Sequence, residues 1–496
     1  MGPMEGLRYI RRLTRYERIL LILFLLSLPL VNPWVRGDGV GYYAYARALV
    51  VNGNLRFEPD WLHANRSFAV NRVNDHGQIL PEQYTITGHL NNHFSVGPAV
   101  DWIPFLFVTH AAVRAIDHLG GAIPADGFSW PYLYTMALVT AFAGFFGLLF
   151  SFAVARKYFS EKWAFMATLG IWLASSLPVY MYFNPSWSHA HSAFAVALFV
   201  WYWDRTRGMR TTKEWVLLGL ISALMVNMYY LNAVLLFAPL LESAWLIMKP
   251  DRYAEGKSAA PWRNLFAKNV LFAVVALFGL LPTLAMHRII YGNPFVSGYL
   301  GLQSWNWTSP VFAKVLFSSD HGVYSWTPIL IFASSGLFFL TRRERLLGII
   351  VSACALAFYF VISCYPDWNG ISSFGNRFFV SLTAIFVLGL AALFGELERI
   401  WHGSRSALVQ AFAITGLLGA WNAGLIFQWG MHLIPDRGTF SWNEMMYNQF
   451  CVVPEQMTST LARYFTSRSE MMQEIEKQDL RQLQQQGARQ EEKDGS

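Results

Sequence analysis

Apolar runs long enough to cross a bilayer recur along the whole sequence, separated by short polar breaks. A helix needs about 20 predominantly apolar residues to span the hydrocarbon core. Hydrophobic residues occupy 54% of the 496 positions and charged residues only 14%, a balance too apolar for a soluble protein of this length. The sequence therefore predicts an all-α, polytopic integral membrane protein.

We expect about eleven membrane-spanning helices from these runs. The predicted spans are residues 19–33, 131–153, 163–183, 192–203, 214–230, 232–248, 269–290, 326–340, 346–364, 378–395 and 406–428. The first run follows several arginines and has no small-residue cleavage site before Gly37 and Asp38. We therefore expect it to be retained as the first helix.

A further apolar run, residues 98–118, contains Asp101 and Arg114 and is ambiguous. If it does not cross, every short cationic cluster faces the same side, as the positive-inside rule requires. The clusters are the N-terminal arginines, Arg156 to Lys162, Arg205 to Lys213, Lys249 to Lys268, Arg342 to Arg345 and Arg399 to Arg405. The run is therefore predicted to be an interfacial helix, with the N-terminus cytoplasmic and the C-terminus outside.

The sequence divides into a transmembrane module, residues 1–428, and an outer tail, residues 429–496. The module includes a long first outer loop, residues 34–130, with juxtamembrane helices. The outer loops carry few cations but much Trp, Tyr, His and Asp, so candidate chemistry gathers on the outer face. The Gln-rich end from Gln482 to Ser496 is predicted to be disordered.

Asp38 is the first candidate, because it directly follows the first span within Arg36-Gly37-Asp38-Gly39. A carboxylate at a helix N-terminus is stabilised by the helix dipole, so Asp38 could simply be an N-cap. Alternatively, a carboxylate at the bilayer edge, beside glycines that leave room for a ligand, can meet a membrane-embedded substrate. The residues alone leave both interpretations open.

The stretch from Gly37 to Arg47 resembles the GT-C superfamily of membrane glycosyltransferases, which includes protein O-mannosyltransferases and lipid A aminoarabinose transferases. The phrases at residues 186–192, 321–328 and 373–378 resemble those of uncharacterised bacterial members. The likeness runs roughly from Arg8 to Trp421.

This resemblance implies transfer of a monosaccharide from a polyprenyl-phosphate sugar to a glycan, lipid or protein acceptor. It places the site on the periplasmic face of a bacterial inner membrane, with Asp38 as the general base and inversion expected from a single displacement. The chain has no Gly-rich phosphate loop, which argues against a nucleotide-sugar donor. Many relatives place a second acid in the second outer loop, where this chain has only His189 and His191.

Arg377 is the predicted phosphate ligand, as the only cation of its outer loop, although an arginine there can also anchor a helix to headgroups. Arg288 has the same two interpretations. If Asp38 only caps a helix, Asp60 is the next candidate base. The predicted substrate contacts are completed by His189, His191, Tyr42, Tyr43, His321 and Trp326. The first loop also carries Glu58, Trp61, Arg72, Asp75, Glu82, His89 and His93, which the sequence does not rank.

No cofactor is predicted, although His189, His191, His321 and Asp367 could in principle hold a divalent metal. The net charge of +7 comes from small topology clusters, so nucleic-acid binding is not expected. A transporter or lipid flippase is the rival function, and it predicts ionisable residues at mid-span depth and repeated halves with broken helices. The sequence has few such residues, chiefly Glu242 near a predicted cytoplasmic end, and no repeated halves. A glycan polymerase or ligase using a diphosphate carrier is a second rival.

Overall fold

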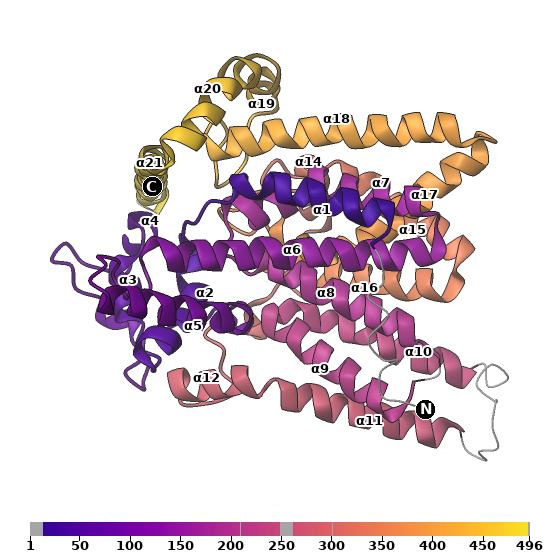
Figure 1. Cartoon of the computed structure of the whole chain (residues 1–496), viewed down its shortest axis with the longest axis horizontal. Helices are drawn as coiled ribbons and strands as arrows, with labels where there is room; N and C mark the ends of the chain where they lie inside the picture. Colours follow the sequence, from indigo (N-terminus) through magenta and orange to yellow (C-terminus); the bar gives the residue numbers. More distant parts are fainter. Residues whose placement is uncertain (1–12, 209, 249–260, 300, 495–496) are drawn as a thin grey trace.

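The computed structural model describes residues 13–208, 210–248, 261–299 and 301–494. The arginines at positions 8, 11 and 12 and the start of the 249–268 cationic cluster lie outside these ranges. Within them the chain forms no strand, only two isolated bridges, Val73 with Ile79 and Tyr84 with Leu90. The long helices run side by side along the molecule (Figure 1), which confirms the all-α prediction.

Each predicted span coincides with helical structure. The long helices are α1 (Arg15–Ser27), α5 (Gly97–His118), α6 (Trp130–Tyr158), α7 (Glu161–Ala174), α8 (His189–Thr206), α9 (Thr212–Met228), α10 (Phe237–Met248), α11 (Pro261–Gly279), α12 (Leu281–Tyr291), α15 (Ile329–Arg343), α16 (Arg345–Cys364), α17 (Thr383–Ile400) and α18 (Ser404–Gly430). Shorter elements include η1 (Leu28–Leu30), η4 (Val179–Phe183), η5 (Tyr230–Leu236), η7 (Leu302–Ser304), α13 (Phe312–Phe317), α14 (Val323–Trp326) and η8 (Arg377–Leu382).

Six of the described helices are long and apolar enough to cross a membrane. A bent pair, α11 with α12, makes a seventh candidate. The chain is therefore a polytopic membrane protein. Other segments are shorter: α1 has 13 residues and is followed directly by η1, and α7 has 14 residues and is followed by a short break and then η4. The number eleven stays a prediction.

Helix α5 meets the length and composition of a span, although its sequence predicted an interfacial helix. It packs on α2 and α6 through the buried Trp102, while Phe105, Phe107 and Val108 are exposed. A helix with one buried and one exposed apolar face suits either position in a bilayer. Its interfacial placement also stays a prediction.

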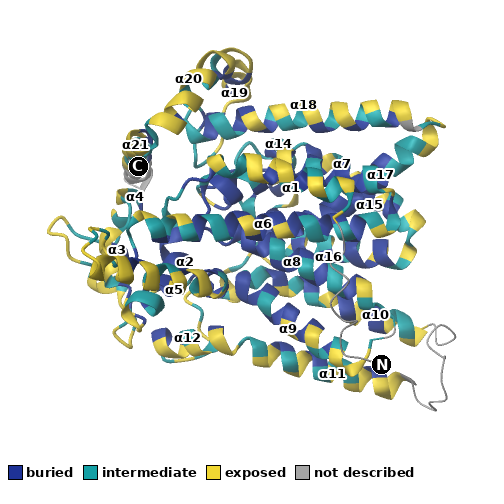
Figure 2. Ribbon diagram, in the orientation of Figure 1, coloured by how far each residue is buried: buried dark blue, intermediate teal, exposed yellow. Residues whose placement is uncertain are grey.

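Helix α17 belongs to the most buried of the candidate spans and packs on α6, α7 and α15. Figure 2 shows that exposed residues recur along α18 and α11, whereas α6 and α8 between them are mostly buried or intermediate. Two glycines allow α15 and α17 to touch backbone to backbone. A Cβ on Gly336 would lie 1.8 Å from the Gly389 carbonyl oxygen, and a Cβ on Gly389 would lie 2.1 Å from the Ala333 oxygen. Small residues that bring backbones together are a common basis of helix association in membranes.

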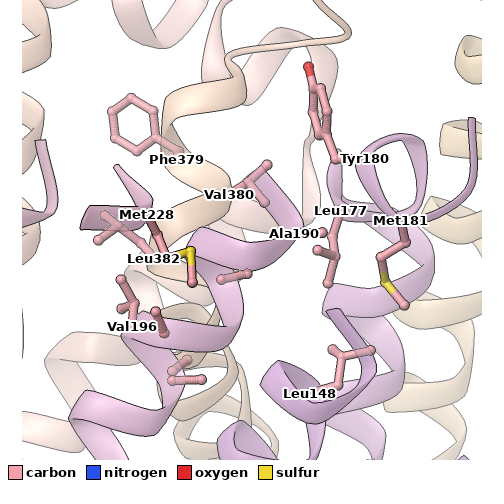
Figure 3. Packing of buried hydrophobic residues seen from close by; sticks show 14 of the residues in the cluster. Leu148, Leu177, Tyr180, Met181, Ala190, Val196, Met228, Phe379, Val380 and Leu382 are labelled. Atoms are coloured by element: carbon pink, nitrogen blue, oxygen red, sulfur yellow. The ribbon is translucent and has the colours of Figure 1, made fainter. Parts of the chain in front are cut away.

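The outer end of α8 packs against η8 through apolar side chains. Figure 3 shows Ala190 and Val196 of α8 near Val380 and Leu382, with Tyr180 on the neighbouring segment. Ser192 and Ser381 join the two elements by a hydrogen bond of 2.7 Å between their hydroxyls. This packing fixes where η8 begins, and therefore where Arg377 lies.

The first outer loop is folded around a buried helix. Its elements are α2 (Asp38–Arg47), η2 (Ala48–Asn52), α3 (Glu58–His63), α4 (Arg66–Ala69) and η3 (Pro81–Gln83). Arg47 binds both oxygens of Asp60, with N–O distances of 2.6 and 2.7 Å, and each side chain is 2% exposed. This bidentate pair holds α3 against α2, because removing one partner would leave a buried charge alone.

The described part of the outer tail is helical, and the predicted disorder from Gln482 stays a prediction. The chain after α18 forms α19 (Trp442–Tyr447), η9 (Asn448–Val452), α20 (Val453–Thr466) and α21 (Arg468–Asp494). Gln, Glu, Lys and Arg are good helix formers, and docking adds tertiary contacts that composition cannot reveal. Glu476 accepts hydrogen bonds from the Ser67 backbone (2.6 Å) and the Asn65 side chain (3.0 Å). Helix α21 thus lies beside α4, on the side of the first outer loop (Figure 1).

Asp60 should make the stability of this loop depend on pH. Burial raises the pKa of Asp60 to about 6 from its ordinary value of 3.8, although the Arg47 contact opposes the rise. Because the pKa of Asp60 is higher in the folded than in the unfolded chain, the protonated carboxyl contributes to the free energy of unfolding. This contribution is fully present below about pH 4 and is lost as pH rises through 6. Between pH 4 and 7 the wild type should lose roughly 2 kcal/mol relative to Asp60→Asn.

Thermal unfolding of both proteins across that range checks this expectation. Asp75→Asn, which changes an exposed acid of the same loop, is the matched control. If the wild type and Asp60→Asn show parallel pH profiles, the proton affinity of Asp60 is the same in the folded and unfolded chains.

Candidate functional site

Two residues that the sequence predicted separately meet in the structure. Asp38 is the first residue of α2, and Arg377 is the first residue of η8, 339 positions later. The Arg377 Nη1 atom lies 2.5 Å from the Asp38 Oδ2 atom. The Arg377 side chain is 11% exposed and that of Asp38 is 31% exposed. The pair is therefore open to a ligand on one side and embedded in protein on the other.

Asp38 is not an N-cap, since Gly37 occupies that position and Asp38 is the first helical residue. Gly37 has φ 53°, a left-handed conformation that glycine adopts without strain. This turn lets α2 start immediately after the first span. The helix dipole then favours the negative charge of Asp38.

The sequence interpretation supposed that the glycines around Asp38 leave room for a ligand. In the structure they do not. A Cβ on Gly39 would lie 1.9 Å from the Ser186 Oγ atom, and a Cβ on Gly41 would lie 2.0 Å from a ring carbon of Phe94. The space is filled by protein. The glycines instead let other outer segments pack closely against α2.

Trp187 contacts both Arg377 and the segment that leads into Asp38. The Arg377 guanidinium lies over the Trp187 ring, 4.6 Å from its centroid, and the Trp187 Nε1–H donates to the Arg36 carbonyl at 3.0 Å. A guanidinium over an indole face is held by attraction to the ring quadrupole. The Arg377 Nε atom is buried and has no hydrogen-bond partner among the described residues. Arg377 therefore keeps donor capacity beyond its contact with Asp38.

Tyrosines surround the pair. Burial, with the nearby Asp38 charge, raises the pKa of Tyr42 to about 12, so its phenol stays protonated at neutral pH. Tyr229 lies between α9 and η5 and stacks with Phe378 at a centroid distance of 6.2 Å. His189 contacts Tyr229 edge-on at 5.5 Å. The site thus offers hydroxyl donors and ring faces next to the charges.

Arg72 and His93 of the first outer loop also lie near Asp38. Burial lowers the pKa of both, while the Asp38 charge raises it, and Arg72 lowers the pKa of His93 further. The Arg72 guanidinium lies over the Phe68 ring at 4.1 Å and donates to the Phe68 carbonyl at 2.7 Å. Asp38 therefore has two arginines around it. No sequence signal distinguishes Arg72 from the other charges of its loop.

The two predicted histidines have different surroundings. His189 is buried among aromatic rings beside Arg377, and its Nδ1 atom has no partner in the described structure. His191 points elsewhere: its Nδ1 lies 2.8 Å from an oxygen of Asp101 and its Nε2 lies 3.0 Å from the Thr140 hydroxyl. His191 joins α8 to α5 and α6, so only His189 adjoins the ion pair.

Three other predicted contacts have structural roles. The Tyr43 hydroxyl donates to the Gly127 carbonyl at 2.7 Å, and Arg288 is exposed, where it bonds the Gly292 carbonyl. Asp60 has both carboxylate oxygens on Arg47, as described above. None of these contacts brings its side chain to Arg377.

His321 and Trp326 are fully buried and stack at 4.8 Å. The His321 Nδ1 atom lies 3.1 Å from Asp320, and the Trp326 indole donates to Ser319 at 3.0 Å. A Cβ on Gly375 would lie 3.3 Å from the Trp326 Cβ. Trp326 therefore supports the turn that precedes Arg377 from behind and is not a ligand contact.

The alternative metal set of His189, His191, His321 and Asp367 does not assemble. In the described part of the chain, the acidic and histidine group close enough to share an ion is His432, Asp436 and Asp479.

An apolar cavity of about 770 Å³ adjoins the site. It lies between α1, α7, α18, α20 and α21, and its lining is almost entirely hydrophobic. Arg36, two residues before Asp38, and Asn184, three residues before Trp187, both line it. A long apolar group in this cavity would contact the wall that includes Arg36.

No protein-family model matches the chain, and no curated protein matches it. Solved structures do resemble it. ArnT from Cupriavidus metallidurans, bound to undecaprenyl phosphate, is 14% identical over 94% of this chain and 74% of that chain, with a TM-score of 0.46.

The apo oligosaccharyltransferase of Archaeoglobus fulgidus is 16% identical, with a TM-score of 0.46. AglB from the same organism, in complex with an inhibitory peptide and a dolichol-phosphate, is 15% identical with a TM-score of 0.45. Each covers 85% of this chain, which spans only 58% of theirs. These likenesses concern the fold alone.

Proposed function

We propose that the protein transfers a monosaccharide from a polyprenyl-phosphate sugar to the hydroxyl of an acceptor on the periplasmic side of a bacterial inner membrane. The observation that supports this most is the Asp38–Arg377 ion pair, in which an acid and a cation meet at the end of the bundle that bears the outer loops. Transfer from a phosphosugar needs both, a base for the attacking hydroxyl and a cation for the leaving phosphate.

Arg377 has the chemistry of a phosphate ligand. Its guanidinium carries five N–H groups in a planar fork that matches phosphate geometry. One nitrogen faces Asp38, and the buried Nε has no partner among the described residues. A donor phosphate that binds Arg377 competes with Asp38 for the same positive charge. Donor binding would therefore release the Asp38 carboxylate to act as a base.

The transfer then proceeds by a single displacement. The acceptor oxygen attacks the anomeric carbon and loses its proton to Asp38 as the new glycosidic bond forms. The bond between the anomeric carbon and the phosphate oxygen breaks, and polyprenyl phosphate leaves with the electron pair. Arg377, with Arg72 nearby, stabilises the extra negative charge that develops on the phosphate. Attack opposite the leaving group inverts the anomeric configuration.

The surrounding groups fit the other parts of the substrate. The phenols of Tyr42 and Tyr229 and the face of Trp187 suit the hydroxyls and apolar faces of a sugar. The apolar cavity that begins at Arg36 can take lipid carbon next to the reacting groups. The sugar and the acceptor are left unspecified by these contacts, because phenols and indoles serve many pyranoses.

Arg377→Ala should weaken use of the lipid-linked donor. Loss of a charge-assisted contact to phosphate costs about 1.5–3 kcal/mol, or roughly tenfold to over a hundredfold in donor affinity. The measurement is donor affinity of purified protein, with folding checked by gel filtration. Arg288→Ala, which removes an exposed arginine from α12, is the control. A folded Arg377→Ala protein with unchanged donor affinity would show that Arg377 only anchors its helix.

Asp38→Asn should nearly abolish transfer while the protein still purifies folded. A general base contributes about a hundredfold to ten-thousandfold in rate, and asparagine keeps the size of the side chain. Single-turnover transfer from a bound donor isolates the chemical step. Asp75→Asn, an exposed acid of the same outer loop, should leave the rate unchanged. Normal transfer by Asp38→Asn would mean that another group takes the proton.

A further inference from the structure

A second cluster of ionisable groups lies outside the Asp38–Arg377 site. His432 and Asp436 follow the end of α18, and Asp479 comes from α21. One potential ligand atom from each residue lies within 4.8 Å of the others. The cluster therefore joins two parts of the chain that are separated by some forty residues of helix.

The cluster is partly buried, with Asp479 buried and His432 and Asp436 of intermediate exposure, and it is incompletely paired. The side chain of His432 is 8% exposed and that of Asp479 is 5% exposed. Asp479 pairs with Arg36 at 2.6 Å and with the His432 Nε2 atom at 2.7 Å. Two buried atoms, His432 Nδ1 and Asp436 Oδ1, have no hydrogen-bond partner among the described residues. Buried polar atoms without partners carry a cost that a bound ion can remove.

The charges of the cluster point to a cation as the missing partner. Asp436 and Asp479 are two carboxylates in one partly buried space, with Arg36 in contact with only the second. A divalent cation would balance the two carboxylates and leave the imidazole neutral.

We propose that His432, Asp436 and Asp479 bind one divalent metal ion, with zinc as the best match. One imidazole nitrogen and two carboxylate oxygens form a ligand set that zinc accepts, and a fourth position remains for water. Magnesium and calcium prefer oxygen ligands alone, so the histidine disfavours them. Arg36, which bonds Asp479, supplies the outer contact that orients a metal-ligating carboxylate.

The ion would act as a structural clip. It fastens α21 to the segment after α18, and through Arg36 it ties α21 to the turn just before Asp38. Met471, Met472 and Ile475 of α21 form one wall of the apolar cavity. Metal binding would therefore hold that wall in place and fix the segment that leads into α2. The inference does not depend on the proposed transfer reaction.

The competing interpretation is a proton in place of the metal. A doubly protonated His432 together with Arg36 neutralises the two carboxylates without a metal, whereas a divalent ion in place of that proton leaves the cluster, Arg36 included, with one net positive charge. The two interpretations differ in their response to chelators and zinc, because only a metal can be removed and restored at constant pH.

The test uses the full-length protein in detergent, stripped with a chelator and then titrated with Zn²⁺. We expect one zinc per chain by elemental analysis and a rise in the unfolding temperature. His432→Ala and Asp436→Asn should lose both effects. Glu474→Gln, which changes an exposed residue of α21, should keep them. Equal zinc binding by the variants, or a wild-type unfolding temperature that ignores chelator and zinc, would overturn the proposal in favour of a proton.

A spectroscopic readout covers the case in which these variants fold poorly. Cobalt(II) should give the wild type the visible absorption of a four-coordinate site. His432→Cys, made in a Cys451→Ser background because Cys451 is exposed, should add a sulfur-to-cobalt charge-transfer band. A wild-type protein without the visible band would exclude the three residues as a metal site.

Discussion

The ion pair between Asp38 and Arg377 is the contact on which the candidate site depends. The Arg377 guanidinium is only 11% exposed, so its charge would be costly to desolvate without the Asp38 carboxylate beside it. Each residue therefore holds the other where a substrate can reach both. The pair also sets an order of events, since a phosphate must displace a carboxylate before that carboxylate can take a proton. Binding and base activation are thereby linked through a single guanidinium.

The rest of the fold brings the two residues together from distant parts of the chain. Gly37 turns the chain sharply after α1, and Gly39 and Gly41 let the 184–188 segment and Phe94 pack against α2. On the other side, η8 is fixed by its packing on α8 and by the support of Trp326. The site thus rests on close backbone contacts, so its geometry is fixed before any ligand arrives.

The sequence predicted the helices because an apolar run of about 20 residues has few alternatives in a bilayer. It also predicted Asp38 and Arg377 as site candidates, because charged residues next to a membrane span cost free energy to desolvate and are few. It could not select Tyr229, Trp187 or Arg72, since aromatic belts and solvated loops contain many similar residues. The glycines near Asp38 were misinterpreted for the same reason: only tertiary structure reveals what fills the space beside them. Helix α21 was missed because a polar composition does not show a docking partner.

Binding of a short-chain prenyl phosphate to wild type and to Asp38→Asn, measured by calorimetry in detergent, tests most directly whether phosphate and Asp38 compete for Arg377. Asparagine keeps the shape of Asp38 but removes its charge, so it no longer competes with an anion. The account predicts several-fold tighter binding by Asp38→Asn, even though this variant cannot complete transfer. Equal or weaker binding by Asp38→Asn would contradict it, because the phosphate would then not take the place of the Asp38 carboxylate on Arg377.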